Sequence, residues 1–128
     1  MTVADELDDI RAEFPECKAL AFVDLSSAMA LTVSARRKPP QETIDELCQN
    51  AIAVLDGPGG EVLVGAAELP PSVRVAHGVL CGQDDLRVFV RSSAVPSEAL
   101  CGLCGHRLDI LAFVVRAARG LSAIEAVQ

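Results

Sequence analysis

The cysteine pair in residues 101–106, CGLCGH, has the residue types and spacing most typical of chemistry in this chain. Two cysteines separated by two residues, Cys101 and Cys104, supply half of a tetrahedral zinc site and need two further ligands. The chain has no second C-x-x-C motif, and His77 and Cys81, four residues apart, are the best remaining candidates. A metal hypothesis therefore consists of these four residues.

The same stretch is also compatible with one turn of an amphipathic helix. At about 100° per residue, Cys104 falls on the apolar side of that helix and His106 on the opposite face, so one zinc ion could not bind both. Cys104 is then a small buried hydrophobe. A thiol-redox pair needs a helix start after a parallel strand, whereas the preceding strands are predicted to form antiparallel hairpins. We favour the helix and keep zinc binding or thiol-redox chemistry at Cys101 and Cys104 as the alternative.

The sequence gives no positive indication of catalysis. His77 and His106 are its two histidines, which leaves few groups for acid–base chemistry. The glycine-rich residues 57–60 are not followed by the Lys-Ser or Lys-Thr of a phosphate-binding loop, and a predicted strand comes next. We therefore expect a protein that is not an enzyme and has no cofactor or bound metal. An enzyme whose pocket the sequence does not reveal is a third hypothesis.

Composition excludes several classes of partner. The 128 residues carry a net charge of −7 and four phenylalanines, without tyrosine or tryptophan, so the chain repels phosphate backbones and has no stacking platform for bases. The first residues are acidic where a signal peptide is basic, and no apolar run approaches the ~18 residues of a membrane span. Five cysteines, an odd number, fit reduced thiols. We expect a cytoplasmic protein without membrane insertion or nucleic-acid binding.

Apolar periodicity predicts eight elements that form one domain. The predicted elements are a helix at residues 2–14 with Thr2 and Asp5 as a capping box, a hairpin at 19–35, a helix at 41–56, strands beginning at Glu61, Val73 and Leu86, and a helix at 96–119. This order, α-β-β-α-β-β-β-α, predicts an α+β fold with a five-stranded antiparallel sheet and helices on its faces. The domain spans residues 1–120, and residues 121–128 form a tail or an extension of the last helix.

Two basic segments are candidate binding surfaces. In the strand that begins at Leu86, the apolar residues alternate with Arg87, Phe89 and Arg91, which predicts a basic second face that carries an exposed phenylalanine. An aromatic residue flanked by arginines is typical of a protein interface. The cluster at residues 36–38 is the densest positive patch. The predicted partner-binding residues are Arg87, Phe89, Arg91, Arg36 and Arg37.

The order of elements resembles the roadblock or dynein light-chain domain family of the bacterial type, a relative of the longin and profilin-like folds. The resemblance extends from Asp5 to Arg119. Its carriers are the opening LDDIRAEFPECKALAFVDLSSAMALTVSA, the helix TIDELCQNAIAVL, the hairpin VAHGVLCGQDDLRVFVRSS and the final amphipathic helix.

The resemblance implies a homodimer without catalytic activity that regulates or scaffolds a small Ras-like GTPase or a motor complex. By analogy of fold alone, the dimer surface is the helix at residues 41–55 with the edge strand around residues 73–79, and a two-fold axis brings the same patch of both subunits together. The implied interface residues are Ile44, Leu47, Cys48, Ala51, Leu55, Val73 and Val75. Two apolar helices outside one small sheet favour dimerisation independently of the resemblance.

Overall fold

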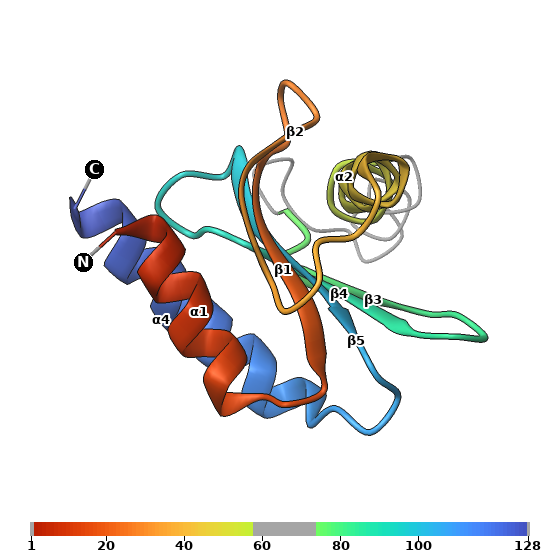
Figure 1. Ribbon diagram of the computed structural model, residues 1–128. Helices are drawn as coiled ribbons and strands as arrows, with labels where there is room; N and C mark the ends of the chain where they lie inside the picture. The colour runs from red at the N-terminus through yellow and green to blue at the C-terminus, as the bar shows by residue number, and fades with distance from the viewer. Residues whose placement is uncertain (1, 58–73, 128) are drawn as a thin grey trace.

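The computed structural model describes residues 2–57 and 74–127, which contain three helices and one five-stranded sheet (Figure 1). The elements are α1 (Val3–Glu13), β1 (Cys17–Asp24), β2 (Met29–Ala35), α2 (Gln41–Leu55), β3 (His77–Cys81), β4 (Leu86–Arg91), β5 (Glu98–Cys104) and α4 (Ile110–Val127). The strands lie in the order β2-β1-β5-β4-β3, and every neighbouring pair is antiparallel. The predicted α+β class and element order are confirmed.

The sheet separates two apolar cores. Helices α1 and α4 lie side by side on one face, and α2 is the described helix on the other (Figure 1). The core beneath α1 and α4 includes Leu7, Phe22, Leu100 and Phe113, and the core beneath α2 includes Val23, Leu47, Phe89 and Cys101. The central strands are therefore buried on both faces. None of the described helices is both long enough and apolar enough to cross a membrane.

The first two predicted helices and the predicted hairpin at residues 19–35 are confirmed. Local sequence signals mark the ends of both helices. Thr2 and Asp5 form the reciprocal capping box at the start of α1, which satisfies backbone N–H groups that the helix leaves without partners. Helix α2 ends at Leu55, two residues before Gly57, as expected for a glycine just past a helix end. The turn between β3 and β4 is closed by a hydrogen bond from the Gly82 N–H to the Asp85 carbonyl, 2.9 Å long.

The helix predicted from residue 96 is wrong over its first part, because residues 98–104 form the central strand β5. A strand between two others with both faces covered carries a near-continuous apolar run, and such a run has no period that separates it from a buried helix. Gly102 fits a close approach of α4, since an added Cβ would lie 2.8 Å from the Phe113 ring. Helix α4 starts at Ile110 and continues past Gly120.

The described sheet has five strands, as predicted, but they are not the five segments that were predicted to form it. The strand predicted from Glu61 lies outside the described residues, and β5 supplies the fifth strand of the described sheet. The strand predicted from Val73 appears as the shorter β3, which pairs with β4 in register from His77 opposite Val90. Among the described strands, β3 and β2 form the two edges of the sheet.

Candidate interaction surfaces

The structure places the two cysteines of CGLCGH on opposite faces of the sheet. Successive side chains of a strand alternate, so residues three apart point to opposite sides. Cys101 packs in the core beneath α2, whereas Cys104 packs in the core beneath α1 and α4. The pair therefore cannot ligate one zinc ion, and the four-residue metal site that includes His77 and Cys81 is not formed. Among residues 2–57 and 74–127, no three His, Cys, Asp or Glu side chains cluster as metal ligands do.

The environment of these thiols keeps them protonated. Complete burial raises the pKa of Cys101 well above the ordinary thiol value. Cys104 lies opposite Cys17 of β1, and a hydrogen bond between the two thiols, together with burial, raises the pKa of Cys104. Because the thiolate is the reactive form of cysteine, neither member of the pair is prepared for redox chemistry.

Phe89, predicted as an exposed partner-binding residue, is fully buried. It packs in the core beneath α2 with none of its surface exposed. The prediction was wrong because it assigned one face of β4 to solvent, and α2 covers that face. The basic residues that alternate with apolar ones along β4 are two arginines, which bind groups of α2 and of the segments next to it.

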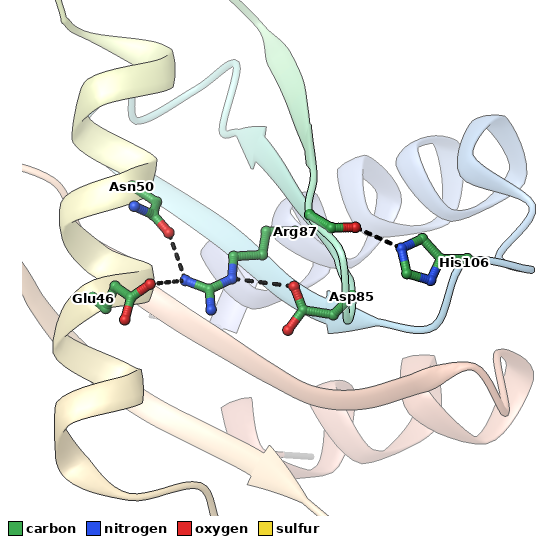
Figure 2. Close-up of polar contacts among 6 residues, drawn as sticks. Glu46, Asn50, Asp85, Arg87 and His106 are labelled. Atoms are coloured by element: carbon green, nitrogen blue, oxygen red, sulfur yellow. Dashed lines mark hydrogen bonds and ion pairs between the residues drawn. The ribbon is translucent and has the colours of Figure 1, made fainter.

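Arg87 joins β4 to the outer side of α2 (Figure 2). Its Nη1 donates to Glu46 Oε1 at 2.8 Å and to Asn50 Oδ1 at 2.7 Å. Its Nε lies 3.4 Å from Asp85 Oδ1 in the β3–β4 turn. Beside this group, His106 contacts the Gly82 carbonyl at 2.7 Å through Nε2. Two of the three guanidinium nitrogens of Arg87, Nε and Nη1, therefore bind groups of its own chain.

Arg91 is more deeply enclosed than Arg87. It ion-pairs with Asp56 at 2.6 Å and donates to the carbonyl oxygens of Leu55, Val75 and Pro96. Only 5% of its side chain is exposed. The predicted role of Arg91 in binding a partner is thus corrected to an internal link between β4, the end of α2 and two loops.

The implied dimer residues on α2 also face inward. Of these, Leu47, Cys48, Ala51 and Leu55 belong to the core beneath α2, Ile44 is buried, and Val75 packs against the same core. The five residues on α2 are covered by the sheet that they pack against, so a second subunit cannot reach them in this fold. Val75 is only partly buried. Val73 lies outside the described residues. The outward side of α2 instead exposes Glu42, Asp45, Glu46, Gln49 and Ala53.

The edge strand β3 borders this outward side of α2. A cavity of about 360 Å³ lies between them, with Glu46 and Asn50 of α2 on one wall and Leu80 and Cys81 of β3 on the other. Leu80 is 39% exposed. An edge strand presents unpaired backbone groups and is a template for another strand. Arg36 and Arg37, by contrast, are exposed in the loop between β2 and α2.

Comparison with known proteins finds likeness at the level of structure. No family model and no curated protein matches the chain. The roadblock/LC7 domain from Streptomyces avermitilis superposes with a TM-score of 0.76 at 12% identity, covering 99% of this chain and 98% of that one. The gliding protein MglB from Thermus thermophilus gives 0.70 at 15% identity, covering 98% and 90%. MglC from Myxococcus xanthus gives 0.64 at 9% identity over the full length of both chains.

These superpositions show that the chain has the roadblock fold. The resemblance inferred from the element order is therefore confirmed as a likeness of fold.

Proposed function

We propose that this roadblock-fold chain is a homodimeric regulator or scaffold without catalytic activity, which binds a small Ras-like GTPase or a related protein. The observation that supports the proposal most directly is the fold, shared along nearly the entire chain with a roadblock/LC7 domain and with the MglB and MglC structures. We also propose a bacterial cytoplasmic location. All five cysteines are free thiols, which supports a reducing compartment such as the cytoplasm.

The proposed dimer surface combines the outer edge of β3 with the outward side of α2. These two elements adjoin in one chain, as the cavity lined by Asn50 and Leu80 indicates. Pairing of β3 with its copy across a two-fold axis would satisfy backbone groups that no other described strand pairs with. The proposed dimer surface thus uses the same two elements as the analogy of fold, α2 and the edge strand. It assigns the contact to the outward-facing residues of α2 and not to the inward-facing ones.

The dimer is tested by light scattering after size-exclusion chromatography. The unaltered protein should elute as a dimer, and Leu80→Lys should convert it to a monomer because two like charges would meet at the joined edges. Leu111→Lys is the matched control, since Leu111 is 74% exposed on α4 at the other face of the sheet. A monomeric unaltered protein would overturn the dimer, and a dimer in both variants would overturn the β3 surface.

The partner is tested by calorimetry with the small Ras-like GTPases of the source organism, each loaded with GDP or a non-hydrolysable GTP analogue. At least one GTPase should bind with an affinity that differs between the two nucleotides, because the switch segments of such proteins change with the γ-phosphate. Absence of binding to every GTPase in both forms would reject the GTPase part of the proposal and leave the dimer unaffected.

A further inference from the structure

A basic pocket of about 390 Å³ lies where β1 begins and β2 ends, towards the opposite side of the sheet from β3. Its cationic residues come from three segments: Arg11 from α1, Lys18 from β1, and Arg36, Arg37 and Lys38 from the loop before α2. The rest of its described lining is uncharged and includes Pro39, Pro40 and Leu103. Five of the chain's 11 lysines and arginines thus surround one small volume.

This concentration of charge is unusual in a chain with 18 acidic residues and a net charge of −7. Arg87, Arg91 and Arg116 each form ion pairs with carboxylates of their own chain. Within the described residues, by contrast, Lys18 and the three cations of the loop have no carboxylate within 4.0 Å. The acidic side chains of the described residues therefore leave these four cations without an ion-pair partner.

Arg11 is the least exposed cation of the group. Its Nη1 donates to Ser34 at 3.0 Å and lies 4.0 Å from Asp8, while its buried Nε has no hydrogen-bond partner among the described residues. Its Nη2 forms no hydrogen bond within the described residues and is not among their buried unpaired atoms, so this nitrogen is the donor that an added acceptor can reach. Five cations that share a pocket repel one another, and an anion between them removes that cost.

We propose that this pocket binds a small soluble ligand with two or more negative charges, of which a polyphosphate or phosphorylated metabolite is the best match. The volume is that of a small-molecule site rather than of a protein interface. Guanidinium groups pair with phosphate oxygens in a planar, two-pronged geometry, and the proline and leucine lining suits an apolar part of the ligand. The inference goes beyond the proposed function and does not depend on it, because the pocket lies away from β3.

The loop gives the site a connection to α2. Pro40, which lines the pocket, accepts hydrogen bonds through its carbonyl from the N–H groups of Thr43 and Ile44 in the first turn of the helix. A ligand that fixes residues 36–40 would therefore fix the start of α2 as well. Arg36 and Arg37, predicted from the sequence to contact a protein, are here assigned to a small anion.

The test is isothermal titration calorimetry of the full chain with pyrophosphate at low and at physiological ionic strength. Binding should weaken with added salt, and the double variant Arg36→Gln with Arg37→Gln should weaken it at least tenfold. The matched control, Arg107→Gln with Arg119→Gln, removes the same charge from exposed positions outside the pocket and should retain the affinity within about twofold. Circular dichroism verifies that both variants are folded.

Three results would overturn the proposal. These are no heat of binding up to millimolar pyrophosphate, equal loss of affinity in the two double variants, and binding of phosphatidic acid vesicles or polyglutamate that pyrophosphate does not displace. The last result would identify a lipid surface or an acidic peptide as the occupant. Because the loop variants leave β3 unchanged, the outcome of the anion-binding test does not affect the interpretation of the dimer and GTPase experiments.

Discussion

The guanidinium of Arg91 donates from Nη2 to the carbonyl oxygen of Leu55 at 2.6 Å. This carbonyl belongs to the last turn of α2, where the chain leaves backbone acceptors without helical partners and where a positive charge is favoured by the helix dipole. The same nitrogen forms the ion pair with Asp56. One strand residue thus supplies to α2 the C-terminal cation that the last turn of the helix itself lacks.

Arg91→Met should destabilise the protein by about 3 kcal/mol, because it removes a buried charged donor and leaves its acceptors unsatisfied. The free energy of unfolding in urea measures the effect. Arg36→Met serves as control, since Arg36 is exposed and its replacement should cost less than about 0.5 kcal/mol. A loss below about 1 kcal/mol for Arg91→Met would contradict the role of Arg91 as an internal link.

Gly102→Ala should cost about 1–3 kcal/mol, because the added methyl group overpacks a full core. The new Cβ would lie 2.8 Å from the Phe113 ring of α4. Phe113→Leu should recover part of the loss in the double variant, which gives the pair a measurable coupling energy.

Gly82→Ala is the matched control for this substitution. Its added Cβ would make an ordinary contact 3.4 Å from the Asp85 carbonyl oxygen, in an exposed turn. Urea unfolding of the four variants checks the prediction. Equal stabilities of the two alanine variants would show that α4 does not pack closely against β5 at Gly102.

The sequence could predict those features whose cause lies within one element. The capping box at Thr2 and the glycine after α2 are local signals, and both were interpreted correctly. Phe89 was not, because its environment depends on which elements cover the sheet. Cys101 was assigned to a helix, although it lies in the buried strand β5. The same alternation of apolar and basic residues can occur whether the basic face of a strand is exposed or covered. On a covered face the arginines need acceptors within the chain, as Arg87 and Arg91 have. The basic pocket could not be predicted from the sequence either, because its residues come from three separate segments, α1, β1 and a loop.

Arg116→Met should destabilise the contact between α1 and α4 by about 3 kcal/mol, since it leaves the Glu6 carboxylate buried without its cation. The two groups lie 2.9 Å apart, with 13% and 7% of their side chains exposed, and Arg116 also pairs with Glu13. Glu6→Leu combined with Arg116→Met should recover much of the loss, because no uncompensated charge remains at this pair. A double variant that is less stable than either single variant in thermal unfolding would contradict this account.

Glu98→Gln should stabilise the protein at neutral pH by a few tenths of a kcal/mol, a small effect because solvent screens the group. Burial, then the neighbouring Glu125 and the charge of Asp24, raise the pKa of the Glu98 carboxyl above its ordinary value of 4.5. A carboxyl whose pKa is raised by folding contributes stability below its unfolded pKa and loses it as the pH rises through the folded pKa.

The benefit of Glu98→Gln should accordingly be present at pH 7 and vanish below about pH 4, where Glu98 is protonated in both the folded and unfolded states. Thermal unfolding midpoints of the two proteins between pH 4 and pH 8 measure the difference. A constant difference across this range would mean that the substitution acts through packing and not through the charge.

Thiol labelling should distinguish Cys81 from the other four cysteines. Cys81 is exposed at the end of β3, whereas Cys17, Cys48, Cys101 and Cys104 are buried. Mass spectrometry after brief treatment with iodoacetamide should therefore find one label per native chain and five in denaturant, because the buried thiols react only after the structure opens. Rapid labelling of Cys101 or Cys104 in the native protein would restore the redox alternative.

The rate at Cys81 also reports on the proposed dimer. If β3 pairs with its copy, labelling should be slower in the unaltered protein than in Leu80→Lys, and it should slow further as the protein concentration rises through the dissociation constant of the dimer. In Leu80→Lys the rate should not depend on concentration. If the unaltered protein is a dimer by light scattering but the rate at Cys81 does not depend on concentration, the two-fold axis lies at another surface, because a paired edge strand would restrict access to the thiol beside Leu80.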